Sequence, residues 1–212
     1  GVGIFATNGS GWATGPGGGL EPGGQGWATL IHEFGHALGL AHPHDNGGTS
    51  SVMQRVTASF SSYGLYDLNQ GVFTTMSYNR GWATGPNGVI VSNQFIQATP
   101  MALDVALVQQ KYGANTTYHS GNDTYQLPVS NSITTDYLCI WDTGGTDTIA
   151  YGGSASCTID LHAATIDYTA TGGGLVSLVS GVYGGFTIAK GAVVENATGG
   201  LGADTLIGNS AD

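Results

Sequence analysis

Residues 32–42 decide the fold of the first half of this chain, and they read His32-Glu33-Phe34-Gly35-His36-Ala37-Leu38-Gly39-Leu40-Ala41-His42. The apolar stripe of residues 27–38 predicts a helix, and Gly39 stands where a helix-ending glycine belongs. His32 and His36, four residues apart, lie one turn apart on the same helical face. Because glycine lets the chain reverse after the helix, His42 can return toward the first two histidines.

Three neutral imidazoles on one ion leave a coordination position open for water, which is typical of a catalytic zinc site. We therefore predict that His32, His36 and His42 bind Zn²⁺ and that Glu33 acts as a general base. The alternative is a helix with incidental surface histidines. The chain has only six histidines, and three of them fill this spacing, which counts against that alternative. His44 is interpreted as a loop side chain outside the ligand set.

The rest of the chain divides into a second helix and a β-rich half. The pattern predicts a helix from about Pro100 to Tyr112, with Thr99 as its N-cap and Gly113 at its end. Beyond about residue 115, β-branched runs alternate with Gly, Asn and Asp turns. Strands are expected at 132–135, 137–141, 147–151, 157–161 and 185–189. The predicted fold class is α+β, with one domain at 1–115 and another at 116–212.

Composition limits the possible partners. The chain has 212 residues, of which 14 are acidic and 4 are basic, so its formal net charge is −10. This charge argues against nucleic acid as a partner. No apolar run approaches the ~20 residues of a membrane span, so no membrane partner is expected. The two cysteines, Cys139 and Cys157, either form one disulfide or remain two buried thiols.

Residues 199–207 match the nonapeptide G-G-x-G-x-D-x-U-x of calcium-binding β-rolls, and they read Gly199-Gly200-Leu201-Gly202-Ala203-Asp204-Thr205-Leu206-Ile207. In such a turn, backbone carbonyl groups face a cation and Asp204 adds a carboxylate. Oxygen ligands of this kind suit calcium better than zinc. The alternative is a plain glycine-rich β-turn.

The zinc helix, His42-Pro43 and the later segment Thr75-Met76-Ser77-Tyr78 resemble the metzincin zinc endopeptidases, in which a Met-turn follows the helix. With the β-roll repeat, they resemble the serralysins, which are secreted bacterial proteases. The similarity continues through residues 103–106, 112–115, 141–147 and 194–197, and so covers most of the chain from Trp27 to Asp204. It implies a partial metzincin catalytic domain (zinc helix, Met-turn, second helix) followed by a calcium-binding β-roll or β-sandwich domain.

The resemblance also implies roles for single residues. Met76 would lie beneath the three imidazoles, and Tyr78 would be a further zinc ligand that stabilises the oxyanion. Glu33 would take a proton from the zinc-activated water and pass it to the leaving amine, which describes a zinc-dependent endopeptidase. The implied cofactors are Zn²⁺ and Ca²⁺. The family's calcium ligands fall on three sets: His119, Gly121, Asp123, Asp142, Gly144 and Asp147; Gly145, Asp147, Val193 and Glu195; and Gly200, Gly202 and Asp204. Of these, His119, Gly121 and Val193 would bind through their backbone carbonyls. Asp142 and Asp147 could alternatively cap ordinary turns.

Only 31 residues precede His32, whereas the serralysin catalytic domain has a much longer segment there. We therefore expect either a fragment of a larger protease that lacks the N-terminal half of the catalytic domain, or a chain whose missing half is a separate partner chain. The other expected partner is a protein or peptide substrate, and the expected location is extracellular. The alternative function is an inactive protease fragment that serves only as a calcium-binding β-roll module. A non-proteolytic zinc hydrolase is a third interpretation.

Overall fold

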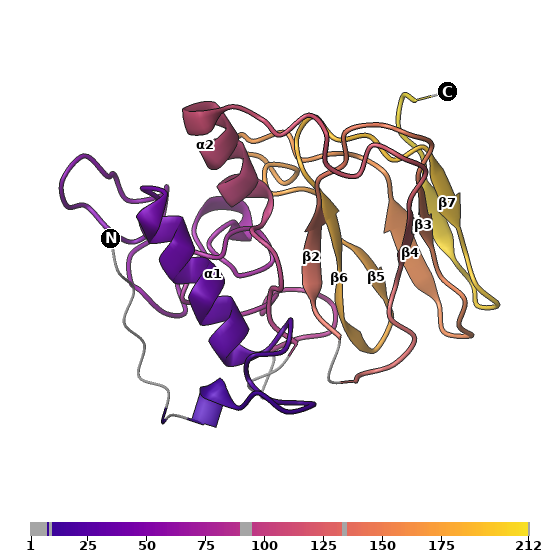
Figure 1. Cartoon of the computed structure of the whole chain (residues 1–212), viewed down its shortest axis with the longest axis horizontal. Coiled ribbons are helices and arrows are strands. Elements are labelled where there is room, and N and C mark those ends of the chain that lie inside the picture. The colour runs from indigo at the N-terminus through magenta and orange to yellow at the C-terminus, as the bar shows by residue number, and fades with distance from the viewer. Residues whose placement is uncertain (1–7, 9, 90–94, 133–134, 212) are drawn as a thin grey trace.

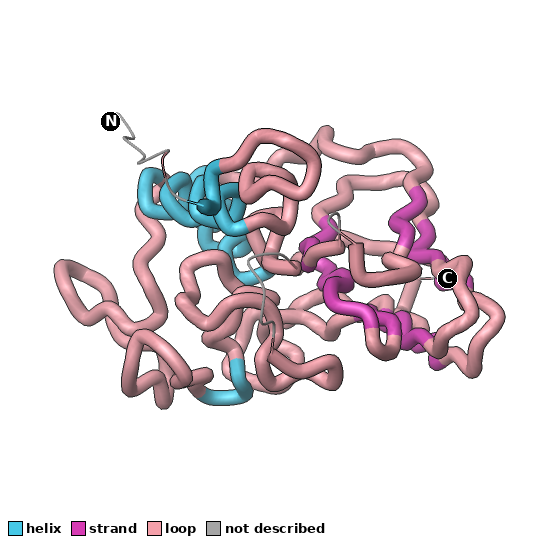
Figure 2. The backbone as a smooth tube through the Cα atoms, turned by 90° about the horizontal axis from the view of Figure 1, so that it is seen from below, coloured by secondary structure: helices cyan, strands magenta, loops and turns pink. Residues whose placement is uncertain are grey.

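The structure is a computed structural model that describes residues 8, 10–89, 95–132 and 135–211. This part of the chain contains two α-helices and eight short strands, so the fold is mixed α and β. The helices lie at one end of the molecule with the N-terminus, and the strands lie at the other end with the C-terminus (Figure 1). Long loops make up much of the helical end (Figure 2), and they include two short 3₁₀ turns, Ser10–Trp12 and Leu65–Asp67. No helix among these residues is long and apolar enough to span a membrane.

The first helix, α1, spans Gln25–Ala37 and ends in the reversal predicted at Gly39. Gly39 has a φ of 88°, a left-handed conformation that favours glycine. The Leu40 N–H donates to the Gly35 carbonyl (3.0 Å), and the Gly39 N–H donates to the His36 carbonyl (2.9 Å). These two hydrogen bonds are those of a Schellman end. The predicted end of the helix is therefore confirmed, and it directs the next loop back along α1.

The apolar stripe of α1 is not part of a hydrophobic core in this structure. Phe34 is 62% exposed and Leu38 is 39% exposed. The helix instead packs through small residues, since its buried positions are Gly26, Ala28 and Gly35. A Cβ atom added to Gly35 would lie 2.5 Å from the sulfur of Met76. The absence of a side chain at Gly35 thus allows α1 to approach the segment that carries Met76.

The second helix, α2, spans Ala102–Tyr112, and its start was predicted wrongly. The N-cap is Met101 and not Thr99. The Met101 N–H donates a 2.9 Å hydrogen bond to the carboxylate of Asp104, three residues later. An acidic side chain in the first turn therefore caps this helix, and a hydroxyl at Thr99 does not. The predicted end at Gly113 is confirmed, because Gly113 has a φ of 86°.

The strands form two sheets. The three-stranded sheet has the order β1 (Thr124–Gln126), β3 (Thr148–Ala150), β7 (Asn196–Thr198), and its strands are parallel. The five-stranded sheet has the order β2 (Tyr137–Ile140), β6 (Val182–Ile188), β5 (Ser177–Val179), β4 (Cys157–Asp160), β8 (Thr205–Ile207), and only β5 is antiparallel to its neighbours. The parallel pairs join residues 24, 47 or 48 positions apart. The chain therefore coils and returns to each sheet in successive turns.

Four of the five expected strands are confirmed, with ends shifted by at most three residues: 137–141, 147–151, 157–161 and 185–189. For the fifth, expected at 132–135, residues 133 and 134 lie outside the described part of the chain. The strands β1, β5, β7 and β8 were not predicted. Each has only three residues, which is too short for an alternating pattern to be recognised.

One hydrophobic cluster joins the two halves of the chain. It contains Leu68, Val72, Phe73, Met101 and Ala102 from the first half, and Tyr137, Cys139, Ala164, Val176 and Ala189 from the second. Residues on both sides of position 115 therefore share a core, and the domain boundary stays a prediction. Cys139 and Cys157 are buried free thiols on β2 and β4, which are separated by two strands. This resolves the open question about the cysteines in favour of two thiols.

Candidate metal centres

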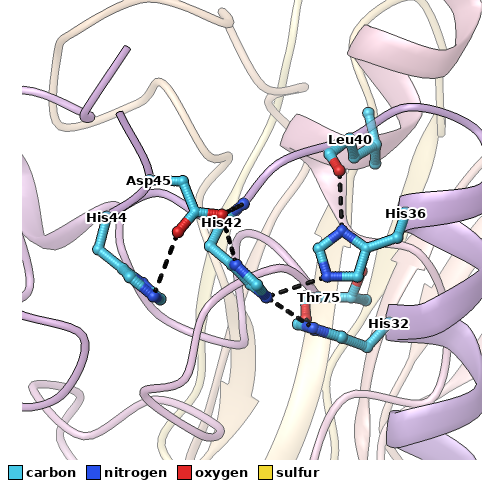
Figure 3. Close-up of polar contacts among 7 residues, drawn as sticks. All are labelled: His32, His36, Leu40, His42, His44, Asp45 and Thr75. Carbon is cyan, nitrogen blue, oxygen red and sulfur yellow. Dashed lines mark hydrogen bonds and ion pairs between the residues drawn. The ribbon is translucent and has the colours of Figure 1, made fainter. Parts of the chain in front are cut away.

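The three predicted zinc ligands converge from two elements (Figure 3). His32 and His36 project from α1, and His42 projects from the loop after Gly39. The Nε2 atom of His42 lies 3.1 Å from Nε2 of His32 and 3.0 Å from Nε2 of His36. Two ligands of a tetrahedral zinc ion with Zn–N bonds of about 2.0–2.1 Å lie about 3.3 Å apart. The observed separations therefore suit one shared ion.

Each of these imidazoles is held through its other ring nitrogen, Nδ1. The partner is an oxygen in every case: Thr75 O for His32 (2.8 Å), Leu40 O for His36 (2.9 Å) and Asp45 Oδ2 for His42 (2.6 Å). Carbonyl and ionised carboxylate oxygens can only accept hydrogen bonds, so each Nδ1 carries the ring hydrogen. Each Nε2 then presents a lone pair toward the other two rings. Partners of this kind orient metal-binding histidines.

The consequence is that three lone pairs meet at one point with no hydrogen between them. A bound cation removes this repulsion and uses all three lone pairs. Burial lowers the pKa of His42 below its usual value, although the hydrogen bond to Asp45 acts in the opposite direction. The neutral form, which is the form that binds metals, is thereby favoured. The donor set fits zinc.

Sequence reasoning missed the groups that orient these histidines. Asp45 follows His42 by three residues in His42-Pro43-His44-Asp45, and that short spacing was the only available signal. The carbonyl groups of Thr75 and Leu40 give no signal, because every residue has a carbonyl group. His44 lies in the loop as predicted, with its ring centre 4.9 Å from that of His42.

The segment opposite α1, residues 74–78, carries Met76 and Tyr78. Met76 is 2% exposed and packs against Gly35 of α1. Tyr78 is 37% exposed, and its ring centre lies 4.7 Å from that of His42. Glu33 and Tyr78 line the same cleft, whose volume is about 280 Å³ and whose other walls include Ala28, His32, Ser77 and Ile96. The predicted general base and the predicted oxyanion group therefore share one space.

Part of the first predicted calcium set lies together, although His119 does so through its imidazole and not through the carbonyl that the resemblance implies. Nitrogen or oxygen atoms of His119, Asp123 and Asp142 lie within 4.8 Å of one another. The Gly121 carbonyl lies so close to Gly145 that a Cβ atom there would collide with it. Asp142 also caps its own turn, because its Oδ1 accepts a 3.0 Å hydrogen bond from the N–H of Gly144, and its Oδ2 accepts one of 2.5 Å from the hydroxyl of Tyr125.

A column of acids joins the first and second calcium sets. Asp123, Asp147 and Glu195 stand one residue before β1, β3 and β7, at equivalent positions of three parallel strands. The Asp123 N–H donates to Asp147 Oδ1 (2.8 Å), and the Asp147 N–H donates to Glu195 Oε2 (2.7 Å). Glu195 also lines a small cleft with Asp142, Gly144 and Val193.

Asp147 is the member of this column that has a buried carboxylate oxygen without a hydrogen-bond partner among the described residues. It is fully buried, and the oxygen in question is Oδ2. Burial raises the pKa of Asp147, and the nearby carboxylates of Asp142, Glu195 and Asp123 add to that rise. A divalent cation among these oxygens would offset both effects. The donor set, composed of carboxylate and carbonyl oxygens, fits calcium.

The third set lies in the turn before β8. Because β4 pairs in register with β8, this turn stacks on the turn before β4. Asp204 Oδ1 accepts a 2.9 Å hydrogen bond from the N–H of Cys157, the equivalent residue of the neighbouring turn. Gly200 and Gly202 lie so close to the neighbouring turn's backbone that a side chain would collide with it. The two stacked turns therefore offer one carboxylate, that of Asp204.

Comparisons of the sequence with known proteins point to one family. The family model described as Peptidase M10 serralysin C terminal matches residues 109–212. Metalloprotease AprA of Pseudomonas entomophila (strain L48) is 33% identical over 199 residues, and Serralysin of Proteus mirabilis is 34% identical over 204 residues. The chain is serralysin-like. These alignments cover 89% and 91% of the chain but 38% and 37% of the two relatives, so it spans little more than a third of their length.

The two kinds of comparison cover different parts of the serralysin-like chain. The family model begins within α2, so it includes every predicted calcium residue and excludes the histidines of residues 32–42. The alignment with Metalloprotease AprA covers 89% of the chain, which leaves too few residues at the ends to miss residues 32–42. The helical half is therefore also part of the similarity.

Proposed function

We propose that this chain carries the zinc centre of an endopeptidase that hydrolyses peptide bonds in protein or peptide substrates. Zn²⁺ would be held by Nε2 of His32, His36 and His42, with Tyr78 as a further ligand. The supporting observation is the convergence of three Nε2 lone pairs whose Nδ1 atoms are all hydrogen-bonded elsewhere. When bound, zinc supplies Lewis-acid chemistry, which polarises a carbonyl and makes water more acidic.

Two side chains in the shared cleft would handle the proton and the developing charge. The Glu33 carboxylate accepts a proton from the attacking water and delivers it to the nitrogen of the leaving amine, so that it ends the cycle ionised. The Tyr78 hydroxyl donates a hydrogen bond to the carbonyl oxygen as that oxygen becomes negative. The cleft, of about 280 Å³, is large enough to accept a side chain of the substrate beside Glu33.

The substitution Glu33→Gln tests this proposal, because it keeps the shape of the side chain and removes its ability to accept a proton. We expect the zinc content to remain near one equivalent while peptide hydrolysis falls by at least about 10²-fold. Glu21→Gln is the matched control, and it should change neither quantity. Hydrolysis by Glu33→Gln at the wild-type rate would refute the role of Glu33.

We further propose that residues 116–212 form a calcium-binding β-roll that stabilises the protease part in residues 1–115. The unpartnered Oδ2 of buried Asp147 and the coiled path of the strands support this proposal. The ligands would be the three sets built on Asp123, Asp142, Asp147, Glu195 and Asp204. Extracellular modules bind calcium at about 10⁻⁴–10⁻³ M, so sites of this kind would be filled outside the cell. We accordingly propose an extracellular location.

The alternative is a calcium-binding module without activity. Measuring zinc binding, calcium binding and peptide hydrolysis on the wild-type chain distinguishes the two functions. If it binds one equivalent of zinc, binds calcium and hydrolyses no peptide, the module function is supported. Peptide hydrolysis that depends on zinc supports the endopeptidase.

A further inference from the structure

A buried carboxylate links α2 to the segment that supports the metal centre. Asp104, in the first turn of α2, is 2% exposed. Its oxygens accept three short hydrogen bonds, from Thr74 Oγ1 (2.6 Å), from the Thr75 N–H (2.7 Å) and from the Met101 N–H (2.9 Å). Two of these donors belong to the segment opposite α1, so the first turn of α2 fixes that segment in place.

The same segment orients His32. The Thr75 carbonyl accepts the 2.8 Å hydrogen bond from Nδ1 of His32, while the Thr75 N–H donates to Asp104. The Thr74 hydroxyl, which donates to Asp104, also accepts a 3.1 Å hydrogen bond from the N–H of Met76. The position of Asp104 therefore determines both the direction of the Thr75 carbonyl and the placement of Met76 under Gly35.

We propose that Asp104 is a positioning residue of the metal centre. By holding Thr74 and Thr75 it sets the direction in which His32 presents Nε2, although it contacts neither metal nor substrate. This inference rests on the proposed zinc site. A carboxylate is required because three donors point at one side chain, and an ionised carboxylate offers acceptors only. An asparagine oxygen could still accept from the Thr75 and Met101 N–H groups, but its NH2 group would then face the Thr74 hydroxyl. That hydroxyl would have to accept instead of donate, so the hydroxyl hydrogen of Thr74 would lose its acceptor and Thr74 would be held less firmly.

The test is Asp104→Asn in the full chain, compared with Asp160→Asn. Asp160 is also buried, at 6% exposed, and its Oδ1 accepts a 2.9 Å hydrogen bond from the N–H of His162 in the β half. Zinc affinity is measured by competition with a chelator, at a temperature where circular dichroism shows every variant folded. The visible absorption bands of the cobalt-substituted proteins report the ligand geometry.

Loss of a group that orients a metal ligand typically lowers metal affinity by about 10–100-fold, so we expect a loss of that size and altered cobalt bands for Asp104→Asn. Asp160→Asn should stay close to wild type in both measurements. A folded Asp104→Asn protein with wild-type zinc affinity and cobalt bands would overturn the proposal. An equal loss in Asp160→Asn would also overturn it, because the effect would then be general destabilisation.

A second variant, Thr74→Val, keeps the proposal testable if Asp104→Asn does not fold. It removes one of the three donors to Asp104 and the acceptor for the Met76 N–H. Zinc affinity should therefore fall, by a smaller factor than in Asp104→Asn. Unchanged affinity and unchanged cobalt bands in Thr74→Val would contradict the proposal. If the wild-type chain binds no zinc at all, the proposed zinc site itself is wrong. That result is distinguishable from a failure of the Asp104 proposal, in which the wild-type chain binds zinc and the variants bind it equally well.

Discussion

Lys111 Nζ donates a 2.9 Å hydrogen bond to the carbonyl oxygen of Leu38, and this bond joins the C-terminal ends of α2 and α1. The hydroxyl of Tyr112 donates to the same oxygen at 3.1 Å. Carbonyl groups in the last turn of a helix lack partners within the helix, and that end of the helix dipole attracts a positive charge. These two side chains therefore stabilise the turn from which the loop carrying His42 departs.

Replacing Lys111 with methionine should test this contact, because methionine keeps most of the aliphatic stem and removes the charge and the donor. We expect the free energy of unfolding to fall by about 0.5–1 kcal/mol, as is typical of one hydrogen bond at a helix end. Urea unfolding followed by circular dichroism measures the change. Lys190→Met, in the β half, is the control, and an equal effect there would contradict the assignment.

The close approach of Gly35 and Met76 makes a second prediction. Gly35→Ala places a Cβ atom 2.5 Å from the Met76 sulfur, so α1 or Met76 must shift. Overpacking of a buried site typically costs about 1–3 kcal/mol. A lower melting temperature is expected for Gly35→Ala, and the double variant Gly35→Ala, Met76→Ala should lose less stability than the sum of the two single losses. If the double variant is less stable than the sum of the single effects predicts, the collision is not the cause.

The helix ends show which parts of this fold can be predicted from the sequence. Gly39 and Gly113 mark the ends of α1 and α2 correctly, because only the local backbone conformation decides them. The start of α2 was predicted wrongly because Asp104 caps it while also binding Thr74 and Thr75, which are distant in the sequence. Three of the missed strands, β1, β7 and β8, were missed for the same reason, since three residues become a strand there only through partners 24 to 48 positions away.

The candidate zinc site shows a similar division. The convergence of His32, His36 and His42 was predictable, since helical spacing and one glycine determine it. Their orientation was not, because it depends on carbonyl groups and on Asp45, whose role appears only when the loop has folded. The identity of the metal remains a proposal that rests on the chemistry of these donors.

The burial of Asp136 leads to a prediction for the stability of the chain at neutral pH. Burial raises the pKa of this carboxyl group to about 7, from 3.8. The folded state therefore disfavours the ionised carboxylate, so the stability that this group contributes is highest below pH 4 and is lost as the pH rises to about 7. Asp136→Asn should increase the free energy of unfolding at pH 8 by a few kcal/mol, because each tenfold difference in acid strength between the folded and unfolded states corresponds to about 1.4 kcal/mol. Urea unfolding at pH 4 should show little difference, and an equal gain at both pH values would contradict the titration of Asp136.

The two thiols should be unreactive in the folded chain. Burial raises the pKa of Cys139 to about 12, and the thiolate is the form that alkylating reagents attack. We expect mass spectrometry to find no modification after brief treatment with iodoacetamide under native conditions, and two modified cysteines after unfolding in urea without reductant. No modification in urea without reductant would indicate a disulfide, which blocks both thiols, and would contradict the assignment.

Calcium should contribute to stability through Asp147. An ion that binds only the folded form adds RT ln(1 + [L]/Kd), which is about 2.7 kcal/mol at 100 times Kd. Removal of calcium with a chelator that spares zinc should therefore lower the melting temperature, and hydrogen exchange should increase first in β1, β3 and β7 and afterwards in α1.

Asp147→Asn should lose most of this calcium dependence. It should nevertheless be more stable than the calcium-free wild type, because it removes a buried charge that faces Asp142, Glu195 and Asp123. Asp167→Asn, at an exposed turn, is the control, and a wild-type melting temperature that does not change after verified calcium removal would rule out the stabilising role.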